Sequence, residues 1–130
     1  MKKIFTLFAA LAMVMSMFAA NIPAGTKLYL TPNSNWKEAN ARFAAYFFGN
    51  GDAWVSMTKV EGETDLYEVI SPNKSYTNVI FCRMNPGTST NSWGNKWNQT
   101  EDLVLANGST FKFTEWGTEA TGWKCQGTWN

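Results

Sequence analysis

The sequence contains no histidine, and its 130 residues include only two cysteines. The first absence excludes catalytic triads with a histidine base and metal sites built on imidazole. Two cysteines without histidine cannot form a zinc site, because structural zinc takes four Cys or His ligands. No glycine-rich phosphate loop is present either. We therefore expect a protein without metal or cofactor.

Charged residues are also scarce, at 16% of the chain. The chain has 11 basic and 10 acidic residues, and two of the basic ones, Lys2 and Lys3, lie in a leader that we expect to be removed. A mature chain so close to neutral gives no support for nucleic acid or an anionic membrane as partner. Asn, Thr, Ser and Gly fill the polar segments instead, which suits a neutral polar ligand.

The first 20 residues are typical of a secretory signal peptide. A short basic start at Met1, Lys2 and Lys3 precedes an apolar run over residues 4–20 that ends in small residues. The run is at the short end for crossing about 30 Å of hydrocarbon, and no cysteine lies beside it to carry a lipid. We expect cleavage near Ala19 or Ala20. Residues 21–130 would then form one monomeric domain, without a membrane anchor, that is secreted, periplasmic or at the cell surface.

The two cysteines, Cys82 and Cys125, allow two interpretations. In an oxidising compartment a disulfide between them would stabilise the fold by about 3–4 kcal/mol in the chain-entropy model. Alternatively Cys82, which ends the apolar run of residues 79–82, is a buried free thiol.

Aromatic residues are abundant, with seven Trp, nine Phe and four Tyr. A small core rarely buries so many rings, so some of them are expected at the surface as contact platforms. The alternative is that a small β-domain uses them only for packing.

Short apolar stretches alternate with turn residues along the chain. They predict strands at 26–31, 42–48, 53–60, 66–70, 78–84, 102–105, 110–114 and 122–125, with a helical turn at 36–41 that tucks Trp36 under the sheet. The pattern predicts an all-β fold, a single antiparallel β-sandwich of the immunoglobulin-like kind with about seven to eight strands.

Strand parity separates two faces of residues 42–48. Phe43, Ala45 and Phe47 form an apolar set that belongs in the core. The other set includes Tyr46 and Phe48 and is expected to be half exposed. The turn at residues 49–52 would bring Trp54 of the next strand close to these two rings, so that the three form one surface.

Several segments in series resemble the family 26 starch-binding modules that accompany bacterial α-amylases and pullulanases. They are WKEANARFAAYFFG (36–49), AWVSM (53–57), LYEV (66–69), VIFCRMNP (79–86) and NKWNQTEDL (95–103). The resemblance covers residues 26–123. It implies non-catalytic binding of α-1,4-glucans, such as starch, glycogen or malto-oligosaccharides, by either a free-standing protein or a piece of an amylase.

The resemblance also implies a ligand site. Its aligned rings are Tyr46, Phe48 and Trp54, on which sugar rings would stack. Phe48 stands where a tyrosine or tryptophan is expected, which removes a possible hydroxyl contact. Lys96, Asn98 and Gln99, in a segment expected to be a polar loop, would bond sugar hydroxyls. Trp93 and Trp97 are spaced four residues apart, so a helical turn would place both on one side. There they are expected to pack the loop on the sandwich, with sugar contact as the less favoured alternative. Arg83 is expected to brace the edge of the sheet.

Two other functions remain open. A secreted β-sandwich can bind protein, as an inhibitor or adhesin subunit does, and paired carboxylates could make a small glycosidase. Most of the acids lie in polar turns, so we expect no enzyme. Glu61, Glu63 and Asp65 lack the remaining ligands and the glycine placement of a calcium loop, and are expected to be a solvated turn.

Overall fold

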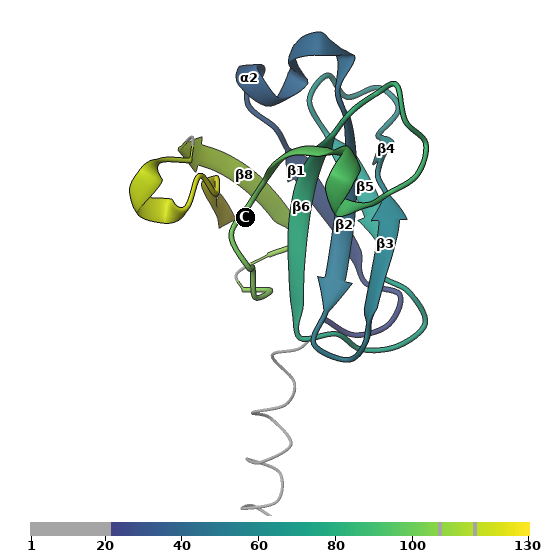
Figure 1. The fold of residues 1–130 in the computed structure, drawn as a ribbon. Coiled ribbons are helices and arrows are strands. Elements are labelled where there is room, and N and C mark those ends of the chain that lie inside the picture. The colour runs from purple at the N-terminus through teal and green to yellow at the C-terminus, as the bar shows by residue number, and fades with distance from the viewer. Residues whose placement is uncertain (1–21, 107, 116) are drawn as a thin grey trace, which may run out of the picture.

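The computed structural model describes residues 22–106, 108–115 and 117–130, so the expected leader and its cleavage site lie outside the described residues. Within this part of the chain, no helix has the length and apolar character needed to cross a membrane. The described residues form nine strands, one short α-helix and three 3-10 helices, which confirms a mostly β fold (Figure 1). The elements in chain order are β1 (Lys27–Thr31), α2 (Ser34–Lys37), η1 (Glu38–Asn40), β2 (Arg42–Phe48), β3 (Asp52–Ser56), β4 (Thr58–Lys59), β5 (Tyr67–Ile70), β6 (Asn78–Met84), η2 (Trp93–Asn95), β7 (Lys96–Gln99), β8 (Thr110–Glu115), η3 (Glu119–Thr121) and β9 (Gln126–Trp129).

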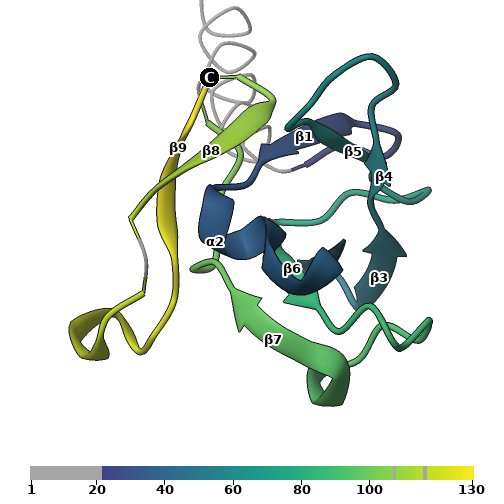
Figure 2. The ribbon, with the colours of Figure 1, turned by 90° about the horizontal axis from the view of Figure 1, so that it is seen from above.

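Two sheets lie face to face as a β-sandwich, and α2 covers one end of it (Figure 2). One sheet has five strands in the order β4-β5-β1-β8-β9, and the other has four in the order β3-β2-β6-β7. The four-stranded sheet is antiparallel throughout. The five-stranded sheet contains a parallel pair, β1 with β8, so the prediction of a wholly antiparallel sandwich is wrong there. The chain visits the opposite sheet between these two strands, which supplies the long crossover that parallel neighbours require.

The predicted strand at 53–60 is divided at Met57. β3 pairs with β2 in the four-stranded sheet, whereas β4 pairs with β5 in the other. Met57 is buried in the core between them, and its N–H still donates to the carbonyl of Phe43 at 2.9 Å. Such a strand that changes sheet at a bend is a common way to close the side of a sandwich.

The main core fills the space between the sheets. Phe43, Ala45 and Phe47 of β2 are all at most 2% exposed, which confirms the predicted inward face. Trp36 is fully buried, as predicted, with its ring centroid 4.2 Å from that of Phe113. The short helix α2 places it there, because the Asn33 side chain caps the helix by accepting from the Trp36 N–H at 3.0 Å.

Two strands do not occur at the positions predicted for them. Residues 102–105 form only an isolated bridge, between Leu103 and Val79. The last strand begins at Gln126 rather than at residue 122, because Gly122 and Trp123 have φ of 63° and 62°. This left-handed conformation is incompatible with an extended strand.

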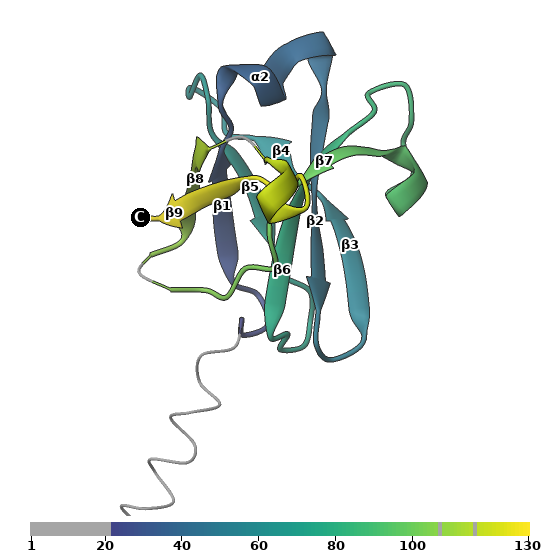
Figure 3. The ribbon, with the colours of Figure 1, turned by 60° about the vertical axis from the view of Figure 1, so that its left-hand side comes forward.

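Sequence patterning also missed β7, whose residues were expected to form a loop. Lys96–Gln99 pairs with the end of β6 and makes an edge of the four-stranded sheet. η2 precedes it; this turn lies in front of β2 in Figure 1 and stands out from the sheet in Figure 3.

Candidate functional site

Three aromatic rings lie together on the outer face of the four-stranded sheet. Tyr46 pairs with Trp54 across β2 and β3, and their ring centroids are 4.9 Å apart with the planes tilted by 52°. Phe48, two residues further along β2, stacks with Tyr46 at 5.6 Å and 25°. All three side chains are half-buried. The structure thus brings together the three rings that the sequence assigns to a ligand site.

A small apolar cluster beneath the rings supports them. Ala44, Ile80, Cys82 and Met84 are buried on this outer face, separately from the main core, and Tyr46, Phe48 and Trp54 pack against them. Each of the three rings is therefore covered in part and exposed to solvent in part. Such a backing limits ring movement, so little side-chain freedom is left to lose on binding.

Trp93 adds a fourth ring that the sequence did not assign to the site. It comes from η2, and its ring centroid lies 4.8 Å from those of both Tyr46 and Trp54, at 65° to each. Trp97 points elsewhere, with its ring 4.7 Å from the Arg83 guanidinium. The predicted helical turn with both tryptophans on one side is therefore wrong, because the chain becomes extended at Lys96. We name the four rings of Tyr46, Phe48, Trp54 and Trp93 the aromatic cluster.

Two of the three predicted polar contacts share the face of the aromatic cluster. Lys96 is paired with Met84 and Gln99 with Cys82, both on the outer side of β6. The Lys96 ammonium donates to Gln99 Oε1 and lies 5.2 Å from the Trp93 ring centroid.

The third predicted contact, Asn98, lies on the other side of the sheet. Its Oδ1 accepts from Arg83 Nη1 at 3.1 Å. Arg83 also donates to the carbonyls of Trp36 and Glu38, at 2.8 Å each, and so ties β6 to the segment over the end of the sandwich. Asn98 belongs to this structural network, away from the rings.

Asp52 places a carboxylate at the margin of the aromatic cluster. The Tyr46 hydroxyl donates to its Oδ2 at 2.7 Å. The pKa of Tyr46 is raised above its ordinary value of 10.0. The largest cause is this hydrogen bond, and burial and the negative charge of Asp52 add to it. The hydrogen bond to Asp52 also restricts the orientation of the Tyr46 ring.

Both cysteines are buried free thiols. Cys82 belongs to the apolar cluster under the rings, whereas Cys125 lies in the main core and accepts from Trp36 Nε1 at 3.3 Å. The two side chains are on opposite sides of the four-stranded sheet, so the structure favours the free-thiol interpretation over the disulfide.

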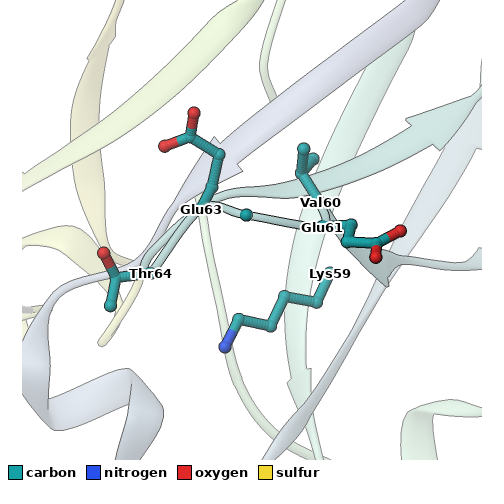
Figure 4. Close-up of a pocket in the computed structure, with 6 residues that line it drawn as sticks. Lys59, Val60, Glu61, Glu63 and Thr64 are labelled. Atoms are coloured by element: carbon teal, nitrogen blue, oxygen red, sulfur yellow. The ribbon is translucent and has the colours of Figure 1, made fainter.

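The acidic turn after β4 is an open surface. A shallow pocket there is lined by Lys59, Val60, Glu61, Gly62, Glu63 and Thr64. The carboxylates of Glu61 and Glu63 point in different directions (Figure 4). Over the residues that the structure describes, no three His, Cys, Asp or Glu side chains gather in a way that could hold a metal ion.

Comparison of the chain with protein-family models, curated proteins and solved structures found no match. The resemblance to starch-binding modules therefore remains a prediction. What the structure itself offers is the chemistry of the aromatic cluster: apolar ring surface, one cation at Lys96 and one anion at Asp52.

Proposed function

We propose that this protein binds α-1,4-glucans without catalysis, on the outer face of its four-stranded sheet. One observation carries the proposal: Tyr46, Phe48 and Trp54 form a contiguous row of half-exposed rings on two neighbouring strands. A glucose ring has an apolar C–H face that stacks on such rings and a margin of hydroxyls that need hydrogen-bond partners. The resemblance to family 26 starch-binding modules, which aligns the same three rings, supports the α-1,4 linkage.

The polar side chains at the margin of the row complete the proposed site. Lys96 donates and Gln99 both donates and accepts, so together they match the mixed character of sugar hydroxyls. Asp52 keeps one carboxylate oxygen available beside the one that Tyr46 bonds. Asn98 is left out of the site, since its side chain bonds Arg83 on the other side of the sheet.

The expected affinity is modest. A stacked ring contributes on the order of 1 kcal/mol, so two or three rings with a few hydrogen bonds give a Kd in roughly the micromolar to millimolar range. Tight attachment to insoluble starch would then need several modules, or a tethered enzyme, acting together.

The proposal also includes the type of sandwich and the export of the protein from the cell. We infer an immunoglobulin-like sandwich, although the parallel β1–β8 pair departs from a purely antiparallel pattern. The leader at residues 1–20 would export the monomeric domain to the surface or exterior of the cell, where starch is met.

The direct test is retention on insoluble starch. The wild type is expected to bind and Trp54→Ala to be washed through, while Trp97→Ala, an exposed tryptophan on the other side of the sheet, is retained. Melting temperatures of both variants show whether they are folded. If the wild type is not retained by starch, glycogen or a malto-oligosaccharide resin, the proposal fails, and a protein ligand for the exposed rings becomes the better explanation.

A further inference from the structure

The most exposed ring of the aromatic cluster is Trp93, the one that the resemblance does not assign. Its side chain is 43% exposed, whereas Tyr46, Phe48 and Trp54 are half-buried. A ligand that approaches this face from solvent therefore meets Trp93 together with the rings below it.

We propose that Trp93 is a further ligand-contacting ring that selects for a bent glucan chain, and that Arg42 is the residue that positions it. This inference rests on the proposed function. It assigns a specificity-determining ring and a positioning residue to the same site.

The plane of Trp93 differs steeply from those of the two rings beside it, which are themselves tilted by 52° to each other. Its plane is 65° from those of both Tyr46 and Trp54, with all three ring centroids 4.8–4.9 Å apart. A ribbon-like β-1,4-glucan offers sugar faces in nearly parallel planes, so it cannot stack on Trp93 and on a neighbouring ring at once. An α-1,4-glucan turns from one sugar to the next, so successive sugars can follow the change of plane.

The loop that carries Trp93 is fixed to the sheet by Arg42. The guanidinium donates to the carbonyls of Thr88 and Thr90 at 2.7 and 2.9 Å, and to Asn91 Oδ1 at 2.6 Å. These three acceptors lie in the loop between β6 and η2, and Arg42 stands at the start of β2. One planar donor group thereby holds the loop at three points.

Further contacts complete the support of this loop. Asn91 Nδ2 donates to Ser56 Oγ of β3 at 3.0 Å, and Asn95 Nδ2 to the Thr90 carbonyl at 2.9 Å. Lys96 lies 5.2 Å from the Trp93 ring centroid on the strand that follows. Trp93 is therefore held in place before any ligand arrives, and a ring held in advance loses less conformational entropy on binding.

The test measures the Kd of soluble maltoheptaose and of cellohexaose by isothermal titration calorimetry. Trp93→Ala is expected to weaken maltoheptaose binding by roughly fivefold, the equivalent of about 1 kcal/mol for one ring. It should leave the weaker cellohexaose binding unchanged, so that the preference for the α-linked chain falls. Trp97→Ala is the matched control, because its ring is 41% exposed and lies outside the cluster; its Kd should stay within about twofold of the wild type.

Arg42 is tested by a double-mutant cycle. Arg42→Ala should weaken maltoheptaose binding in the wild type and have no further effect in the Trp93→Ala background, because it acts only through Trp93. A merely structural role would lower affinity equally in both backgrounds, and that outcome would overturn the assignment of Arg42.

The outcomes separate the two proposals. If the wild type binds maltoheptaose and Trp93→Ala binds it equally well or more tightly, the role of Trp93 is contradicted and the proposed function is unaffected. A wild type that binds no glucan at all would remove both.

Discussion

Tyr46 lies directly opposite Trp54 in the β2–β3 pair, and the short turn between them is what brings their rings to 4.9 Å. The Tyr46 hydroxyl is bonded in turn to Asp52, the first residue of β3. A single β-hairpin therefore supplies two stacking rings, the hydrogen bond that orients one of them, and a carboxylate at the margin of the proposed site.

Tyr46→Phe tests the part played by that hydrogen bond. The variant keeps the ring but loses the bond to Asp52, so maltoheptaose affinity should fall by no more than about fivefold, because an exposed hydrogen bond contributes about 0.5–1 kcal/mol. Tyr46→Ala, which also removes the ring, should lose considerably more. Equal losses for the two variants in calorimetric titrations would show that the hydroxyl, rather than the ring, matters.

The stability difference between the wild type and Tyr46→Phe is expected to depend on pH. Because the pKa of Tyr46 is raised in the folded protein, the stability that the phenol contributes is present below pH 10 and is lost as pH rises through the raised value. The wild type should therefore lose stability relative to Tyr46→Phe only above pH 10.

Sequence patterning predicted β2 and β6 with their observed bounds, since both have long alternating or continuous apolar runs. It also predicted the rings of Tyr46, Phe48 and Trp54 on one surface, because parity and a short turn are local properties. β7 was missed because its residues, Lys96–Gln99, carry no apolar alternation. Pairing with β6, a tertiary interaction, decides its conformation.

The position of Trp93 could not be predicted for a related reason. Spacing along the chain placed it with Trp97, but the loop is set by hydrogen bonds from Arg42, more than 40 residues earlier in the sequence. Asn98 was assigned to the site because the sequence does not reveal the pairing register of β7. A bulge between Arg83 and Met84 shifts this pairing and turns Asn98 toward Arg83. Bulges of this kind depend on the partner strand.

Arg83 is predicted to stabilise the fold without affecting the ligand. Arg83→Ala leaves the carbonyls of Trp36 and Glu38 without their donor, so urea unfolding should show a loss of about 1–3 kcal/mol. Arg83→Lys restores the charge but not the fork of donors, and should recover only part of this loss. Maltoheptaose affinity should be unchanged in both, and a weakened Kd would contradict the separation of this network from the aromatic cluster.

Gly49 is predicted to be required at the β2–β3 turn. Its φ is +98°, and a Cβ there would lie 1.6 Å from Thr77 Oγ1. Gly62 is the matched control, with φ of +84° and nothing within 4 Å of its Cβ position. Gly62→Ala should cost about 1–2 kcal/mol for the left-handed backbone alone, and Gly49→Ala clearly more, as measured by urea unfolding. Equal losses would show that Thr77 moves aside freely.

Cys82 is predicted to make stability fall at alkaline pH. Its burial raises the thiol pKa from 9.0 to about 12, against a smaller opposing effect of the Lys96 charge. A raised folded pKa means that the stability is fully present below pH 9 and is lost as pH rises toward 12, at about 1.4 kcal/mol per pH unit. Urea unfolding of the wild type and Cys82→Ala at pH 7.5 and pH 11 measures this difference. At pH 7.5 the wild type should have the larger free energy of unfolding, and this difference should shrink or reverse at pH 11. The reason is that ionisation of the Cys82 thiol at high pH stabilises the unfolded chain, and Cys82→Ala has no thiol to ionise. If the two proteins keep the same difference at both pH values, Cys82 ionises as easily in the folded protein as in the unfolded chain, and the rings of the aromatic cluster do not shield it from water.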